Sequence, residues 1–101
     1  MNRKIVALCG SMKFSAQMHE TAEQLELDQG FVVLTPVAHV LDRELTGEEK
    51  ALLNQLHRAK IDLADAVYIV NPGGYIGEAV RSEIEYALYL GKEILYLENE
   101  S

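Results

Sequence analysis

Short apolar runs alternate along this chain with longer segments of mixed polarity. Four of the runs have the length of a β-strand and cover residues 5–9, 31–35, 66–70 and 94–97. Valine, isoleucine and leucine are frequent in them, which is typical of strands buried on both faces of a sheet. Helix-length segments separate the runs, so the pattern predicts alternating strands and helices.

Two of the separating segments carry clear helix signals. In the first, apolar residues recur at helical spacing, at Phe14, Met18, Ala22 and Leu25. Gly30 provides a C-terminal stop for that helix. The second helix begins with the capping-box pattern Thr46-Gly47-Glu48-Glu49 and continues to Asp65. Its apolar face consists of Leu52, Leu56, Ala59 and Leu63.

A third helix is predicted from about Glu78 to Leu90, with Gly91 closing it. Its inward face is expected to carry Val80, Ile84, Ala87 and Leu88. Residues 36–45 form the one longer loop of the predicted arrangement. Loops of this length often cover a functional site, so we expect this segment to lie near a ligand.

Short buried strands joined by helices imply a parallel sheet with helices on both faces. Right-handed connections favour the strand order 2-1-3-4. We therefore expect an α/β fold with a small doubly wound sheet of about four strands, of the Rossmann or flavodoxin type. In that order the switch point lies between the first and third strands, and ligands of open α/β sheets bind beyond the carboxyl ends of the strands at such a point.

The segment from Asn71 to Glu78 carries the strongest functional signal. It holds three glycines within five residues, which permit positive φ and the close approach of a ligand. The helix that follows offers free N–H groups to an anion. A plain strand-to-helix turn explains the same glycines equally well. At the switch point this loop meets the loop after the first strand, and the substrate-binding residues expected there are Gly10, Ser11, Met12, Lys13, Asn71, Gly73, Gly74, Gly77, Glu78, Arg81 and Ser82.

Composition narrows the range of partners. With 101 residues, of which 49% are hydrophobic, the chain is expected to form one domain, residues 1–101. A net charge of −7 and a pI near 4.8 argue against nucleic acid and acidic membrane surfaces. Local N–H groups and one or two cations can still hold the phosphate of a small ligand. No apolar segment has the length expected of a signal peptide or a membrane span.

Cysteine and histidine positions argue against metal chemistry. Cys9 is the only cysteine, which excludes an internal disulfide and favours a reducing cytoplasm as the location. Its place at the end of an apolar run favours a small buried filler over a nucleophile. The histidines, His19, His39 and His57, show no ligand spacing with one another or with Cys9, so no metal site is expected. Residues 10–15 match no phosphate-binding or dinucleotide glycine signature, and no cofactor is expected.

Three motifs taken together are similar to those of one known family. The first is Cys9-Gly10-Ser11-Met12, after the first strand. The second is the segment 57–65, His-Arg-Ala-Lys-Ile-Asp-Leu-Ala-Asp. The third is the segment 77–87, Gly-Glu-Ala-Val-Arg-Ser-Glu-Ile-Glu-Tyr-Ala, with Gly91-Lys92 closing the helix. In this combination, nearly the whole chain resembles the nucleoside 2-deoxyribosyltransferase-like superfamily, which includes deoxynucleoside monophosphate N-glycosidases.

The resemblance implies roles for particular residues. Glu83 stands where the family has the glutamate that attacks the anomeric carbon of the sugar. Related hydrolases bind the 5′-phosphate near strand-end loops, which here implicates Ser11, Lys13, Arg81 or Ser82. Active members usually carry a second acid two helical turns before the strand-start aspartate, and His57 stands at that offset from Asp65. A histidine can donate a proton to a leaving base near neutral pH.

These observations define one leading hypothesis and two alternatives. The first is hydrolysis of the N-glycosidic bond of a nucleoside or nucleoside 5′-monophosphate. Hydrolysis is preferred to transfer because the sequence stops at Ser101, short of the C-terminal segment of the transferases. The alternatives are a nucleotide-binding module of the same fold without catalysis, and a small interaction protein without a ligand.

Self-association is also expected. The segment 86–90, Tyr-Ala-Leu-Tyr-Leu, is apolar on nearly every side of its helix. One side can cover the sheet, while another needs a partner, and aromatic side chains are enriched in such interfaces. The sequence therefore predicts a symmetric homodimer, unless the loop 36–45 folds over that face.

Overall fold

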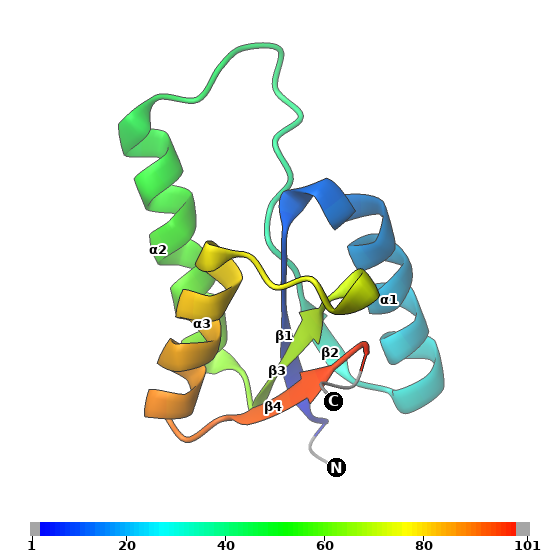
Figure 1. Cartoon of the computed structure of the whole chain (residues 1–101). Coiled ribbons are helices and arrows are strands. Elements are labelled where there is room, and N and C mark those ends of the chain that lie inside the picture. Colours follow the sequence, from blue (N-terminus) through cyan, green and yellow to red (C-terminus); the bar gives the residue numbers. More distant parts are fainter. Residues whose placement is uncertain (1–2, 99–101) are drawn as a thin grey trace.

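A parallel four-stranded sheet forms the centre of the molecule (Figure 1). The computed structural model describes residues 3–98. The strands are β1 (Ile5–Gly10), β2 (Val32–Leu34), β3 (Ala66–Val70) and β4 (Glu93–Tyr96), and they lie in the order β2-β1-β3-β4. The α/β class, the parallel pairing and the predicted order are therefore confirmed. β4 begins and ends one residue earlier than predicted.

Helices cover both faces of this sheet (Figure 1). α1 (Ser15–Gln29) lies on one face, while α2 (Gly47–Leu63) and α3 (Glu78–Tyr89) lie side by side on the other. Short 3-10 turns follow two strands, η1 (Met12–Phe14) after β1 and η2 (Pro72–Gly74) after β3. None of the helices in residues 3–98 is long and apolar enough to cross a membrane.

The two central strands supply most of the buried core. Toward α1, Leu8 and Val70 pack with Met18. Toward α2 and α3, the opposite sides of the same strands pack with residues from both helices, and that cluster consists of Ala7, Cys9, Ile61, Ala64, Val67, Ile69, Val80 and Ala87. Complete burial of a side chain such as Leu8 contributes about 1.5–3 kcal/mol to stability. The ends of β1 and β3 are thus held in a rigid layer.

Two predicted apolar faces are wrong in part. On α2, Leu52, Leu56 and Leu63 remain 52%, 48% and 69% exposed, and His57 and Ile61 are the buried residues. On α3, Leu88 is 60% exposed, although Val80 and Ala87 are buried as predicted. A helix with a wide apolar arc has several orientations that satisfy its periodicity, and the sequence does not determine which part of the arc meets the sheet.

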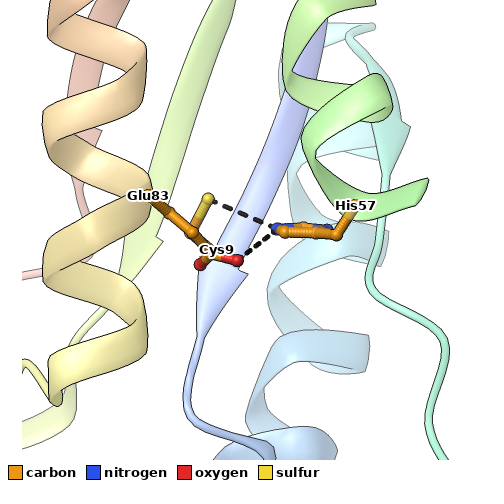
Figure 2. Close-up of side chains that lie close together, drawn as sticks. All are labelled: Cys9, His57 and Glu83. Atoms are coloured by element: carbon orange, nitrogen blue, oxygen red, sulfur yellow. Dashed lines mark hydrogen bonds and ion pairs between the residues drawn. The ribbon is translucent and has the colours of Figure 1, made fainter. Parts of the chain in front are cut away.

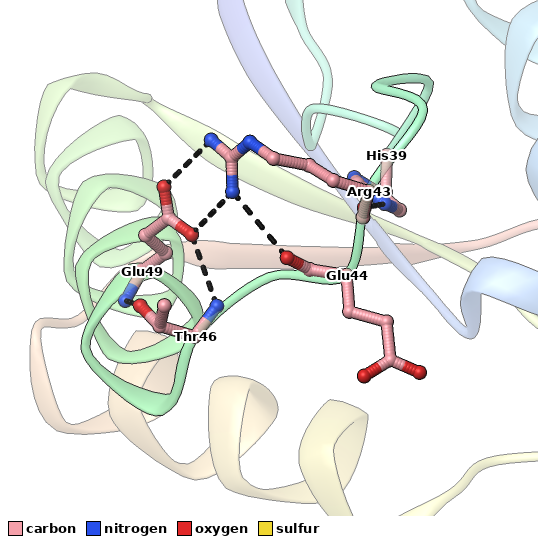
Figure 3. Close-up of polar contacts among 5 residues, drawn as sticks. All are labelled: His39, Arg43, Glu44, Thr46 and Glu49. Carbon is pink, nitrogen blue, oxygen red and sulfur yellow. Dashed lines mark hydrogen bonds and ion pairs between the residues drawn. The ribbon is translucent and has the colours of Figure 1, made fainter.

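The connection between β2 and α2 is anchored at the start of α2 (Figure 3). Thr46 and Glu49 form the predicted capping box: the Glu49 N–H donates to Thr46 Oγ1 at 3.1 Å, and the Thr46 N–H donates to Glu49 Oε1 at 2.9 Å. Arg43 donates to both oxygens of the Glu49 carboxylate, at 2.8 and 2.9 Å. This guanidinium lowers the pKa of Glu49 to about 2. The loop is therefore tied to the helix that follows it.

Candidate active site

A cavity of about 950 Å³ opens beyond the carboxyl ends of β1 and β3. Residues 10–12 and 77–80 line one side of it, and residues 36–39 line another. This is the predicted switch point, and the loop 36–45 contributes to its wall as expected. The volume lies at the upper end of small-molecule sites, which hold about 300–1,000 Å³. The cavity therefore suits a ligand as large as a nucleotide.

α2 supplies much of the remaining wall. Leu56 and Leu63 are exposed on this helix because they face the cavity rather than the sheet. Polar side chains from the same helix are interspersed among them, namely Lys50, Asn54, His57 and Lys60. Lys60 Nζ donates to the carbonyl oxygen of Thr35 at 2.7 Å, whereas Lys50 is exposed. The result is a largely apolar pocket with a few polar groups, which is the usual character of a ligand site.

Three side chains with reactive or ligand atoms meet at the inner end of this cavity (Figure 2). Cys9 comes from β1, His57 from α2 and Glu83 from α3. His57 Nε2 lies 3.3 Å from Glu83 Oε2 and 3.6 Å from Cys9 Sγ. Glu83 keeps 21% side-chain exposure and lines the cavity, so its carboxyl group can reach a ligand.

Burial controls the charges of this trio. It raises the pKa of Glu83 to about 7, although Cys9 and Arg58 act in the opposite direction. It lowers the pKa of His57 to about 4, with a smaller contribution from Lys60. At neutral pH the imidazole is therefore uncharged, and Glu83 is close to half ionised. Because the imidazole is uncharged, the 3.3 Å contact between His57 Nε2 and Glu83 Oε2 is a polar contact rather than a pairing of full charges.

Cys9 is not suited to nucleophilic attack. Its side chain is fully buried, and burial raises the pKa of the thiol well above its usual range, with Glu83 adding to the effect. A thiolate is the nucleophilic form of cysteine, so this thiol is inert toward substrates. The sequence interpretation of Cys9 as a buried residue agrees with this position, but its contact with His57 was not foreseen.

Several of the residues predicted for the site do lie around the cavity. Those lining it are Gly10, Ser11, Met12, His57, Gly77, Glu78 and Glu83. Gly10 also has a packing reason to be glycine, because a Cβ there would lie 3.1 Å from the sulfur of Met18 and 3.2 Å from Val70. At the other side, the first turn of α3 begins at Gly77 without a side-chain cap, so its N–H groups are available to a ligand.

The glycine loop after β3 has a structural role in its first half. Asn71 is fully buried, and its side chain exchanges hydrogen bonds with the backbone of Glu98, at 3.0 and 2.9 Å. The Gly73 N–H donates to a carboxylate oxygen of Glu98 at 2.6 Å. Gly73 and Gly74 have φ of 64° and 80°, which explains why glycine occupies both positions. Asn71 and Gly73 hold the chain after β4, and none of the three predicted residues lines the cavity.

The other predicted phosphate contacts also lie outside the cavity lining. Lys13 Nζ sits 3.5 Å from the ring centre of Tyr75, in a cation–π contact. Ser82 accepts a hydrogen bond from Arg58 at 3.0 Å, and Arg58 stacks on Tyr86 with 4.7 Å to the ring centre. Arg81 is exposed on α3. Among the described cations, Lys50 and Lys60 line the cavity instead.

From α2, sequence reasoning proposed His57 but missed the other residues that line the cavity. Lys50, Asn54 and His57 follow one another at positions i, i+4 and i+7, which places polar groups on one stripe of a helix that also carries leucines. That polar stripe is the sequence feature that could have predicted a ligand-facing side of α2. Tyr75 was also not predicted as a site residue, although it lies within the predicted ligand loop and lines the cavity.

Comparison with known proteins adds no family to this picture. The chain matches no protein-family model, and no curated protein is found to be its relative.

Proposed function

We propose that this protein hydrolyses the N-glycosidic bond of a nucleoside or nucleoside 5′-monophosphate, with Glu83 as the nucleophile. The observation that carries this proposal is a carboxyl group with a pKa of about 7, on the wall of a cavity large enough for a nucleotide. Perturbed carboxyl groups in clefts are frequent at catalytic sites. The resemblance of the motif around Glu83 to the glycosidase glutamate is in agreement with the same role.

The reaction needs a carboxylate beside the anomeric carbon. In the first step, an oxygen of Glu83 bonds to that carbon while the carbon–nitrogen bond breaks and its electron pair leaves with the base, which takes up a proton from solvent water. In the second step, water attacks the same carbon, loses a proton and releases the carboxylate. The transition states carry positive charge on the sugar, and a poorly solvated carboxylate stabilises that charge more strongly than an exposed one does.

The cavity wall offers one surface for the base of such a substrate and another for its phosphate. The leucines of α2 provide an apolar surface for a base. Ser11, Lys50 and the first turn of α3 provide donors for a 5′-phosphate. Lys50, rather than the Lys13 suggested by the sequence, is the cation that contacts the phosphate in this proposal. A nucleotide ligand is also compatible with the cytoplasmic location inferred from the single cysteine.

His57 acts as a positioning residue in this proposal. With a pKa of about 4 the imidazole is neutral at pH 7, and the N–H that it keeps is a very weak acid, so His57 is a poor proton donor to the leaving base. Its Nε2 lies 3.3 Å from Glu83 Oε2 and holds the carboxyl group in place instead. His57→Ala should therefore lower kcat by about 10- to 100-fold and leave KM nearly unchanged, because substrate contacts remain. A large rise in KM with unchanged kcat would contradict the positioning role.

Base release from a panel of nucleosides and nucleoside 5′-monophosphates tests the proposal. Glu83→Gln should preserve the fold and ligand binding and lower the rate by at least about a hundredfold. Glu85→Gln is the matched control, because Glu85 is an exposed residue of the same helix. Its variant should retain the wild-type rate.

The outcomes separate the competing functions. Thermal stabilisation by these ligands without any base release would favour the silent binding module. Neither stabilisation nor release would favour an interaction protein without a small ligand. Wild-type turnover in the Glu83→Gln variant would show that another group is the nucleophile.

A further inference from the structure

Three potential metal-ligand atoms converge at the inner end of the cavity. Sγ of Cys9, Nε2 of His57 and a carboxylate oxygen of Glu83 all lie within 4.8 Å of one another. Both neighbours approach the same ring nitrogen, which holds at most one hydrogen and makes one good hydrogen bond (Figure 2). Three atoms with lone pairs that face one point form a typical ligand set for a metal ion.

The distances agree with tetrahedral coordination. Zinc bonds of about 2.3 Å to sulfur and about 2.0–2.1 Å to nitrogen and oxygen place the sulfur and nitrogen ligands about 3.6 Å apart, and the nitrogen and oxygen ligands about 3.3 Å apart. The observed separations are 3.6 Å for Cys9 Sγ to His57 Nε2 and 3.3 Å for His57 Nε2 to Glu83 Oε2. The third pair of atoms, Cys9 Sγ and the Glu83 carboxylate oxygen, lies within 4.8 Å.

Charge and ligand type favour zinc. A thiolate, a neutral imidazole and a carboxylate carry two negative charges, which a divalent ion neutralises in a buried setting. Sulfur and imidazole ligands select zinc over magnesium or calcium, which prefer oxygen. Glu83 lines the cavity, so an ion can arrive from that side, and a water molecule can complete the fourth position.

We propose that Cys9, His57 and Glu83 form a zinc-binding site at the inner end of the cavity, and that the bound ion inhibits base release. On binding, the Cys9 thiol loses its proton to solvent and the sulfur bonds to the metal. The inhibitory part rests on the proposed function, because the ion occupies the carboxylate oxygen that attacks the sugar. Chain spacing gave no sign of this site, because its ligands come from β1, α2 and α3.

Cobalt(II) titration of the protein after treatment with a chelator tests binding without reference to activity. A thiolate ligand gives cobalt an intense near-ultraviolet charge-transfer band. This band should saturate at one equivalent of cobalt and disappear when zinc displaces the cobalt. Cys9→Ala should abolish the band, and Glu83→Gln should weaken zinc binding by at least about tenfold, which is within the range for altered metal sites. His19→Ala is the control, because this exposed histidine should not affect the titration.

Circular dichroism of each variant shows whether it has kept its fold, and Glu83→Gln provides a second test should Cys9→Ala unfold. No band in the wild type, or a band that persists in folded Cys9→Ala, would overturn the metal site. Base release by zinc-loaded protein at the metal-free rate, or faster, would overturn the inhibition. A saturating band together with no base release from metal-free protein would support the metal site and refute the proposed function.

Discussion

Replacing Glu83 by glutamine should stabilise the protein, and the gain should depend on pH. The carboxyl group has little contact with solvent, and burial raises its pKa from 4.5 to about 7. Between these two values the unfolded chain ionises at this position, while the folded protein keeps the proton. The stability associated with the protonated carboxyl is therefore complete below about pH 4.5 and is lost as the pH rises through about 7.

The expected magnitude follows from the shift. At about 1.36 kcal/mol per pKa unit, a change from 4.5 to about 7 corresponds to at most about 3 kcal/mol of folding free energy. Glutamine has nearly the same shape and does not titrate. The free energy of unfolding of Glu83→Gln, relative to wild type, should therefore rise by up to about 3 kcal/mol between pH 4.5 and pH 8.

Urea denaturation at both pH values measures this difference. Far-ultraviolet circular dichroism is the suitable signal because the chain contains no tryptophan. A chelator in the buffer keeps the carboxyl group free of metal. Glu85→Gln serves as the control, and this exposed substitution should change stability by less than about 0.5 kcal/mol at either pH. If the free energies of unfolding of Glu83→Gln and wild type differ by the same amount at both pH values, burial does not raise the pKa of Glu83.

Three further predictions concern the rest of the molecule. Thr46→Ala removes one half of the capping box and should lower the free energy of unfolding by about 1 kcal/mol in urea denaturation, and an unchanged value would show that the box does not hold the start of α2. In calorimetry, nucleoside monophosphates should bind at least about tenfold more tightly than the matching nucleosides, and salt should reduce this difference in affinity. Lys50→Ala should reduce the difference more than Lys13→Ala does, and equal affinities for the two ligand types would exclude a phosphate site. We also propose the homodimer expected from the sequence, since Tyr89 is 86% exposed, and light scattering at micromolar concentration should give twice the chain mass of 11.3 kDa; a monomeric mass would contradict it.

The fold could be predicted because its signals are local. The apolar run at residues 66–70 coincides with β3, Gly30 ends α1 with φ of 68°, and Thr46 and Glu49 cap α2 as expected. Right-handed crossover connections then leave few possible strand orders. Each of these features depends on neighbouring residues or on a general rule of topology.

The site could be predicted only in part because it depends on how the helices are rotated. Glu83 was proposed from its motif and does line the cavity, but the contact of Cys9 with His57 joins residues that are 48 positions apart. Periodicity placed the leucines of α2 on an apolar face and did not show that this face meets a cavity. The same limitation affected Lys13, whose side chain lies on Tyr75 because of the path of two loops.

Trapping of a glycosyl-enzyme intermediate tests the role of Glu83 most directly. A 2-fluoro-substituted nucleoside 5′-monophosphate slows both steps, because the electron-withdrawing fluorine destabilises each oxocarbenium-like transition state, and a base that is a good leaving group keeps the first step fast enough for the intermediate to accumulate. Intact-mass spectrometry of metal-free wild-type protein should show the gain of one fluorosugar phosphate, and peptide mapping should locate it on Glu83. Glu83→Gln should gain no mass, and Glu85→Gln should react as the wild type does. An adduct on another residue, or none from a wild-type protein that releases base from natural substrates, would contradict Glu83 as the nucleophile.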